Sequence, residues 1–178
     1  MRIAVRRGYQ RTGEDLGAIG LLREVDIAED YHIELMKQLR ALGHEVLDVT
    51  PPEAHRSLTD SIDYGVDKAN AWGADLYISC QTNNYYHRFN GALGSEVLYY
   101  KWSNKGKIYA ENIEKHLVKI GFRSRGAKGD AKYLIELAKT EMPAIIIKAF
   151  FVEASEDVAL WRSVGAKGVA EAIARGLK

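Results

Sequence analysis

Short apolar runs rich in β-branched residues alternate with longer segments of helical period along this chain, and this alternation restricts the fold more than any other feature. The run from Ala74 to Cys80 is almost continuously apolar, which is typical of a central strand covered on both faces. The segment from Val25 to Leu42 instead gathers its apolar residues on one stripe and is followed by Gly43, as helices often are. The pattern predicts an α/β fold, with a mostly parallel twisted sheet flanked by helices.

The same pattern predicts the remaining elements. Strands are expected at Arg2 to Val5, Glu45 to Val49, Ser95 to Tyr100, Tyr133 to Leu137 and Ala144 to Val152. Helices are expected at Ser57 to Trp72 and Asn104 to Ile120, and a last helical region, capped by Ser155, is expected to break near Gly165 and end at Gly176. Gln81 to Gly94 is expected to be a loop, and Gly126 to Asp130 a turn-rich connector. No repeat or linker divides the 178 residues, so one domain is expected over residues 1–178.

Charge and cysteine content exclude several classes of partner. The 25 Lys and Arg residues nearly balance the 24 Asp and Glu residues, so the chain has no overall field that would attract nucleic acid or an acidic membrane. Cys80 is the only cysteine and lies in an apolar run, which favours a buried thiol in a reducing compartment. The apolar stretch within Met1 to Arg7 is too short for a signal peptide, so we expect synthesis in the cytoplasm. We expect no nucleic-acid or membrane partner.

Polar or charged residues interrupt the apolar pattern at four places, each at the end of a predicted strand or the start of a predicted helix. Open α/β sheets bind their ligands at such strand ends. Taken singly, each place has an ordinary structural explanation, such as a helix N-terminal carboxylate for Glu24. The four places are Arg7 to Gln10, Leu21 to Glu24, Ser79 to Asn83 and Ile146 to Phe151.

Together with other motifs, these segments carry a resemblance that covers essentially the whole chain. The sequence resembles the zinc-dependent N-acetylmuramoyl-L-alanine amidases of the cell-wall hydrolase type, and especially the catalytic domains of clostridial phage endolysins. The resemblance implies a single domain with the amidase architecture, which is similar to that of phosphorylases and hydrolases. The matching stretches are Arg7-Gly8-Tyr9-Gln10, Gly17 to Gly20 leading into Arg23-Glu24, Ala74 to Ser79 running into Asn83, Gly94 to Tyr100, Arg125 to Lys128, and Pro143 to Ile147 before Phe150 to Val152.

The resemblance also implies where an active site belongs. In that family a His after the first strand, a Glu at the start of the first helix and a His after the central strand hold zinc, and a Glu at the end of the last strand is the catalytic base. The matching positions here are Tyr9, Glu24, Gln81 and Lys148, so only Glu24 has the family's residue type. Three of the four active-site positions are therefore expected to be substituted.

These substitutions remove the chemistry of a hydrolytic zinc site. Gln81 offers only a weak neutral amide oxygen, and Tyr9 binds metal well only as a phenolate, so we expect no zinc and no other cofactor. A protonated Lys148 cannot accept a proton from water and repels a divalent cation. We expect its ammonium to pair with Glu24, with hydrogen bonds from Tyr9 and Gln81 around the pair. The alternative is that Lys148 extends into solvent.

The polar and aromatic segment from Asn83 to Asn90 suits a glycan or a peptide in a shallow cleft. Its candidate binding residues are Asn83, Asn84, Tyr85 and His87. The alternative is that its aromatic rings pack locally and cover the edge of the sheet. A different metal site built from His87 and Glu24 is a weaker possibility.

Three functional hypotheses follow from the resemblance. The first is a catalytically inactive amidase fold that binds peptidoglycan or a muropeptide, or that has a regulatory role. The second is an active amidase that cleaves the N-acetylmuramoyl-L-alanine bond with an atypical metal site, and the third is an engineered descendant of a lysin. A chain without an export signal fits release to the cell wall by phage-type lysis, as the resemblance implies.

Overall fold

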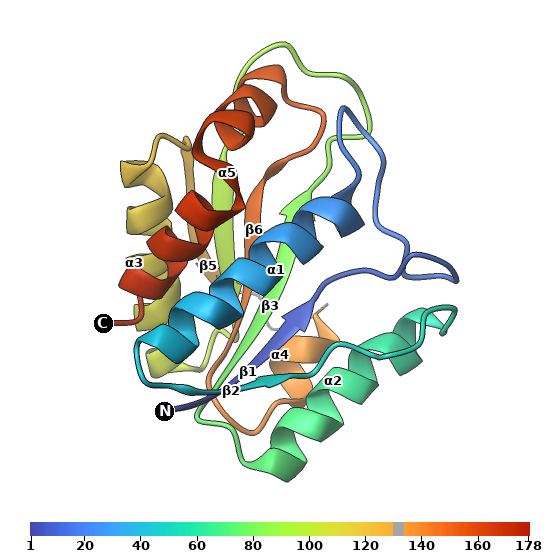
Figure 1. Ribbon diagram of the computed structural model, residues 1–178, viewed down its shortest axis with the longest axis vertical. Helices are drawn as coiled ribbons and strands as arrows, with labels where there is room; N and C mark the ends of the chain where they lie inside the picture. Colours follow the sequence, from blue (N-terminus) through green and yellow to red (C-terminus); the bar gives the residue numbers. More distant parts are fainter. Residues whose placement is uncertain (130–133) are drawn as a thin grey trace.

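A single six-stranded sheet forms the centre of the computed structural model, which describes residues 1–129 and 134–178 (Figure 1). The strands lie in the order β2-β1-β3-β6-β4-β5. Their bounds are β1 (Arg2–Arg7), β2 (Glu45–Asp48), β3 (Leu76–Asn83), β4 (Ser95–Tyr99), β5 (Ser124–Gly129) and β6 (Ala144–Phe151). The helices are α1 (Glu24–Ala41), α2 (Leu58–Trp72), α3 (Asn104–Lys119), α4 (Ile135–Lys139) and α5 (Ser155–Arg175).

The sheet is parallel except at one pair of strands. β2, β1, β3 and β6 run in the same direction, and β4 pairs with β6 in the antiparallel sense. β5 is an edge strand that pairs parallel to β4. The predicted α/β class and the mostly parallel sheet are therefore confirmed.

Helices cover both faces of the sheet, and two apolar clusters lie between the layers. α1, α3 and α5 contribute to the larger cluster, and α2 and α4 border the smaller one on the opposite face (Figure 1). The apolar side chains of β3 and β6 alternate between these clusters: Ile78 and Ile147 face the first, whereas Tyr77 and Ile146 face the second. A strand buried on both faces needs a continuous apolar run, which is what the sequence provides there.

Local signals explain several helix ends. The Ser57 hydroxyl accepts a hydrogen bond from the Asp60 N–H at 3.1 Å and so caps α2, which ends at Gly73 with a φ of 65°. α5 is interrupted at Gly165, where φ is 67°, as the sequence predicted. Among the described residues, no helix is both long enough and apolar enough to span a membrane.

The prediction was wrong for three segments. β3 continues to Asn83, so Gln81 to Asn83 belong to a strand and not to a loop. Ser124 to Gly129 form the edge strand β5 instead of a connector, because this polar segment needs only one neighbour, β4, to pair its backbone. Residues 135–137, predicted as part of a strand, begin the short helix α4, and Tyr133 lies outside the described residues.

The predicted cap of the last helix was also wrong. Ala154 occupies the N-cap position of α5, and no side chain caps this helix. The Ser155 hydroxyl instead accepts the Gly91 N–H at 3.1 Å and donates to the Asn90 side chain at 3.2 Å. Ser155 therefore holds the segment that follows β3 against the start of α5.

Candidate functional site at the carboxyl ends of the strands

The four positions singled out in the sequence lie around the carboxyl ends of β1, β3 and β6. Tyr9 follows β1, Glu24 is the first residue of α1, Gln81 lies in β3 and Lys148 in β6. Gln81 and Lys148 are directly paired in the parallel register of these two strands. The fold thus collects residues that are far apart in the sequence at one edge of the sheet.

Tyr9 and Glu24 are in direct contact. The Tyr9 hydroxyl lies 3.0 Å from Glu24 Oε1 and 2.8 Å from the Thr82 carbonyl oxygen, so two acceptors share its single proton. Burial, with a further contribution from the Glu24 charge, holds the pKa of Tyr9 well above its usual value. Tyr9 also has a left-handed backbone, with a φ of 67°, which costs energy in a bulky residue and is common at functional sites. The phenol is therefore a fixed, neutral hydrogen-bond donor.

Glu24 is almost completely buried, and its carboxylate accepts hydrogen bonds from three uncharged groups. Oε2 accepts the Ala18 N–H at 2.6 Å, and Oε1 accepts the Thr82 hydroxyl at 3.0 Å as well as the Tyr9 hydroxyl. Burial raises the pKa of Glu24, although the Ala18 N–H and the charge of Lys148 oppose this effect. Of the hydrogen bonds predicted around a Lys148–Glu24 pair, the one from Tyr9 to Glu24 is present.

Lys148 occupies the middle of the site without a direct ion pair. In the register of the sheet it lies between Gln81 of β3 and Glu96 of β4, and its Nζ is 6.0 Å from the centre of the Tyr9 ring. Within residues 1–129 and 134–178, no carboxylate oxygen lies within 4.0 Å of this Nζ. The pKa of Lys148 is lowered below its usual value by burial, and the charges of Glu24 and of other carboxylates around the site oppose this shift.

The expected pair of Lys148 and Glu24 is therefore corrected. The two charges interact across the site, but Glu24 Oε1 and Oε2 are already satisfied by uncharged donors, which leaves the ammonium without a contact to this carboxylate. The alternative of a fully solvated side chain is also wrong, since Lys148 is half-buried. Gln81 does not join the hydrogen bonds around Glu24 either.

Gln81 instead belongs to a second polar network, which sequence reasoning missed. Its amide donates to Ser79 Oγ and to Glu136 Oε2, both at 3.1 Å. Glu136 Oε1 accepts the Arg6 guanidinium at 3.1 Å and the Tyr77 hydroxyl at 2.9 Å. Arg6 is 1% exposed and also donates to Asp15 Oδ2 at 3.0 Å. The sequence analysis did not identify Arg6 because it ended the first strand at Val5. It did not identify Glu136 because it treated the residues of α4 as part of a strand.

The predicted binding residues lie at the end of β3 (Asn83) and in the segment that follows it (Asn84, Tyr85 and His87). Asn83 donates to Glu96 at 2.9 Å, and the ring of Tyr85 packs edge-on against Phe89, 5.6 Å away, as local packing would require. Tyr86 and His87 are exposed, and the Tyr86 side chain is 85% accessible. Tyr86 borders a groove of about 360 Å³ together with Arg88, Glu153 and the residues 18–21.

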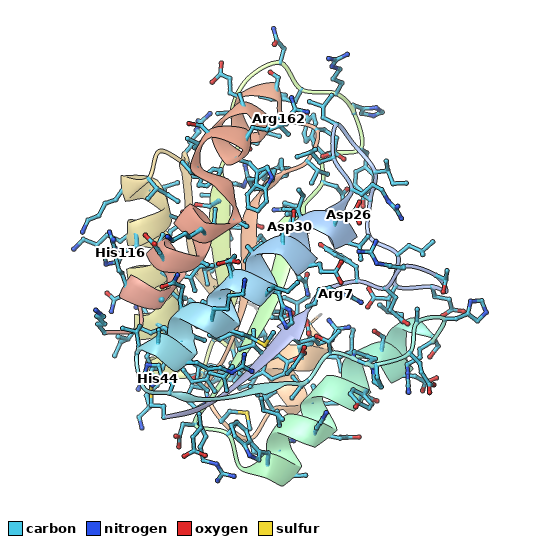
Figure 2. The ribbon with its side chains drawn as sticks, in the orientation of Figure 1. Arg7, Asp26, Asp30, His44, His116 and Arg162 are labelled. Carbon is cyan, nitrogen blue, oxygen red and sulfur yellow. The ribbon has the colours of Figure 1, made fainter. Side chains whose placement is uncertain are left out.

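Within the described residues, no histidine is a hydrogen-bond or ion-pair partner of Tyr9, Glu24, Gln81 or Lys148. His32 belongs to α1, and its Nε2 lies 3.3 Å from Oδ1 of Asp48 at the end of β2. Figure 2 shows His44 beyond the far end of α1 and His116 on α3, both well away from Arg7 and Asp26 at the site edge. Among the described residues, no group of three or more His, Cys, Asp or Glu side chains is arranged to hold a metal ion. His87 and Glu24 thus have no third ligand of these types.

Comparisons with known proteins agree with the fold. The chain is 36% identical over 178 residues to an uncharacterised protein of Clostridium perfringens, covering 99% of this chain and 51% of that protein. It is also 31% identical over 169 residues to the N-acetylmuramoyl-L-alanine amidase LytC of Bacillus subtilis, covering 92% of this chain and 32% of that protein. The chain thus spans about half of the Clostridium perfringens protein and about a third of LytC.

Solved structures show the same architecture. The catalytic domain of an endolysin targeting Clostridia difficile superposes with a TM-score of 0.89 at 32% identity, covering 99% of this chain and 96% of that chain. The amidase AmiC2 of Nostoc punctiforme superposes with a TM-score of 0.82 at 24% identity, covering 99% and 94%, which shows the shared fold. The family model for N-acetylmuramoyl-L-alanine amidases matches residues 3–178. The chain therefore belongs to the N-acetylmuramoyl-L-alanine amidase family.

Proposed function

We propose that this chain keeps peptidoglycan, or a soluble muropeptide, as its ligand and does not hydrolyse it. The observation that carries the proposal is the set of groups around Glu24, the only one of the matched positions with the residue type of the family's zinc ligands. The Tyr9 phenol, the Thr82 hydroxyl and the Ala18 backbone N–H donate to its carboxylate, and Lys148 lies nearby. Membership of the amidase family supports peptidoglycan as the ligand.

The donor set does not fit a catalytic zinc ion. Such an ion takes three protein ligands and one water, and it favours imidazole, thiolate or carboxylate groups. The Tyr9 hydroxyl holds its proton firmly, and the Gln81 amide is bound to Ser79 and Glu136. Glu24 alone leaves two of the three ligand positions without a suitable donor.

The general base is missing for a separate reason. A base must accept a proton from the attacking water, and a protonated ammonium has no free electron pair for this. Burial favours the neutral form of Lys148, but the charge of Glu24 opposes that effect, and the other nearby carboxylates add to the opposition. We infer that Lys148 does not take the place of the family's catalytic carboxylate.

The test is hydrolysis of purified clostridial cell walls by the natural chain and by the triple variant Tyr9→His, Gln81→His, Lys148→Glu. We expect no loss of turbidity and no release of new amino groups with the natural chain. We expect the triple variant to take up zinc and to gain chelator-sensitive activity. Chelator-sensitive lysis by the natural chain would instead establish an active amidase with an atypical metal site, and would refute the proposal.

Sedimentation with intact cell-wall sacculi tests the binding half of the proposal. The natural chain should sediment with sacculi and remain in solution without them. A chain that stays in solution in both cases would refute binding to intact peptidoglycan, and would leave a soluble muropeptide or a protein partner as the ligand.

A further inference from the structure

An exposed tryptophan lies at the end of the sheet opposite to the candidate site. Trp102 is 73% exposed and follows β4, whose last residue, Tyr99, pairs with Ile145 near the start of β6. A strand rises about 3.3 Å per residue, so Lys148 lies roughly 10 Å further along β6 than Ile145. Figure 1 shows the start of β6 and the segment after β3 at opposite ends of the sheet. Trp102 is therefore separate from the candidate site.

The backbone and a neighbouring lysine hold the ring of Trp102 in place. The Ser103 N–H donates to the Tyr100 carbonyl oxygen at 2.8 Å, which closes a tight turn with Lys101 and Trp102 at its tip. A Cβ at Gly129 of β5 would lie 3.1 Å from Lys101 Cβ, so the turn packs against the edge strand. The Lys101 ammonium lies over the Trp102 ring, 4.6 Å from its centre. The indole is thus a fixed aromatic surface that faces solvent.

Trp102 borders an open groove of about 340 Å³, and the segment before β6 forms another wall of this groove. Two hydrogen bonds fix that wall. The Thr140 hydroxyl donates to the Glu136 carbonyl oxygen at 2.9 Å, and the Glu141 N–H donates to Asn70 Oδ1 at 3.0 Å. Walls that are already rigid lower the entropy cost of binding, because no loop has to become ordered.

The polar side chains of the groove include unpartnered donors and acceptors. Within the described part of the chain, the exposed Asn104 side chain forms no hydrogen bond, and the exposed Glu141 carboxylate forms neither a hydrogen bond nor an ion pair. Lys105 also lines the groove, so Glu141 is matched by one cation of opposite charge. A carboxylate in the groove repels an anionic ligand, whereas an uncharged ligand with hydroxyl groups can donate to it.

We propose that this groove binds the glycan strand of peptidoglycan, with one sugar ring stacked on Trp102 and its hydroxyl and acetamido groups hydrogen-bonded to Asn104 and Glu141. A pyranose ring has aliphatic C–H groups on its faces and hydroxyl groups at its rim, so it matches an aromatic surface beside polar groups. The inference rests on the proposed function and adds to it a second site, remote from the candidate site. The carboxylate of Glu141 favours this uncharged ligand over an anionic membrane.

The test is titration of the natural chain with a neutral pentamer of N-acetylglucosamine, followed through the indole N–H NMR signals of its tryptophans. Trp72 and Trp161 lie outside the groove and serve as internal references. We expect the pentamer to shift the Trp102 signal and to leave the other two unchanged. In a second arm, we expect the chain not to sediment with phosphatidylglycerol vesicles. Sedimentation with the vesicles, and no shift of Trp102 by the pentamer, would assign the surface to a membrane and overturn the inference.

Matched variants locate the stacking surface, with binding followed through the backbone amide signals of Asn104 and Glu141. Trp102→Ala should weaken binding of the pentamer about tenfold or more, and Trp102→Phe, which keeps a smaller ring, should weaken it less. Ile108→Ala removes another exposed apolar side chain, on α3 and outside the groove, and should leave the affinity unchanged. Equal affinity of Trp102→Ala and the natural chain would overturn the inference. If Trp102→Ala fails to fold, Trp102→Phe decides by the same criterion.

The two proposals fail in distinguishable ways. If the chain sediments with sacculi but the pentamer leaves the Trp102 signal unchanged, the groove is not a glycan site and the proposed function stands. If the pentamer shifts the Trp102 signal but the chain does not sediment with sacculi, binding to intact peptidoglycan fails as the function. The groove then remains a site for a soluble sugar chain.

Discussion

The pKa of Glu96 and its contribution to stability depend on the side chains that donate hydrogen bonds to its carboxylate. Its carboxylate accepts hydrogen bonds from Asn83 at 2.9 Å, from Arg125 at 3.2 Å and from Lys128. Burial alone would raise the pKa of Glu96, but the hydrogen bond from Lys128, with those from Asn83 and Arg125, lowers it below the usual value of 4.5. Because the folded pKa is depressed, the stabilisation is complete above pH 4.5 and is lost as the pH falls through the folded pKa.

The variant Glu96→Gln tests this dependence. We expect it to lower the free energy of unfolding by about 1 kcal/mol at pH 7, because both cationic partners are partly exposed and screened by solvent. The difference should be smaller at pH 3 than at pH 7, because the pH has then fallen below 4.5 toward the depressed pKa of Glu96 and the carboxylate begins to lose its charge. Urea denaturation at both pH values measures it, and Glu111→Gln, in an exposed pair on α3, should change little at either. An equal loss at both pH values would contradict the assignment.

Replacing Arg6 should lower the free energy of unfolding more than replacing Glu96, because the partners of Arg6 are buried. Its guanidinium joins Asp15 and Glu136, and Arg6→Met would leave these two carboxylates without their cation. We expect a loss of about 3 to 5 kcal/mol in the free energy of unfolding, measured by urea denaturation. The double variant Arg6→Met, Glu136→Gln should lose less than the single variant, because one stranded charge is removed with its partner. A single variant within 1 kcal/mol of the natural chain would refute a buried ion pair.

At the scale of elements, the turn into β4 has the tightest backbone approach in the sheet region. Gly94 has a φ of 90°, and a Cβ there would lie only 1.9 Å from the Arg123 carbonyl oxygen. Gly43, after α1, has a similar φ of 83° but no atom within 4 Å of such a Cβ. Comparing substitutions at these two glycines therefore separates the cost of a left-handed backbone from the cost of a steric clash.

Gly43→Ala should therefore cost about 1 to 2 kcal/mol, the strain of a left-handed alanine. Gly94→Ala adds a clash with backbone and should cost about 3 kcal/mol or more, or prevent folding. Thermal and urea denaturation of the two variants measure the difference. Equal losses would show that β4 and the turn before β5 move apart freely, contrary to the close approach of Gly94 to the Arg123 carbonyl oxygen.

The elements also show how far the sequence predicts this fold. β3 and β6 were found because strands buried on both faces need continuous apolar runs. β5 and α4 were missed because neither has such a pattern: β5 is a polar edge strand, and α4 is a five-residue helix held by Glu136. Their conformation depends on neighbours distant in sequence, which a local pattern does not encode.

The candidate site was likewise predicted only where its contacts do not depend on neighbours distant in the sequence. Tyr9, Glu24, Gln81 and Lys148 were selected by resemblance, and the structure brings them to one edge of the sheet. Their contacts were predicted only in part: Tyr9 binds Glu24, whereas Gln81 turns to Glu136. The orientation of Gln81 depends on the buried Arg6 network, which has no sequence motif of its own.

At the scale of the whole molecule, the chain has the amidase fold, and the polar groups of its candidate site bind to one another: Tyr9 and Thr82 donate to Glu24, and Gln81 donates to Glu136. The donors around Glu24 satisfy its carboxylate without a metal ion, and Lys148 supplies a positive charge nearby. Under the proposed function, the natural chain folds without a metal ion. We expect the chelator EDTA to leave the melting temperature of the natural chain unchanged, whereas it should lower that of a zinc-loaded triple variant.

The zinc content of the natural chain, purified from zinc-supplemented medium and measured by elemental mass spectrometry together with its activity on cell walls, tests the central claim most directly. The account predicts far less than one zinc ion per chain and no release of stem peptide from the glycan. One tightly bound zinc ion per chain, with hydrolysis that chelation abolishes, would contradict it.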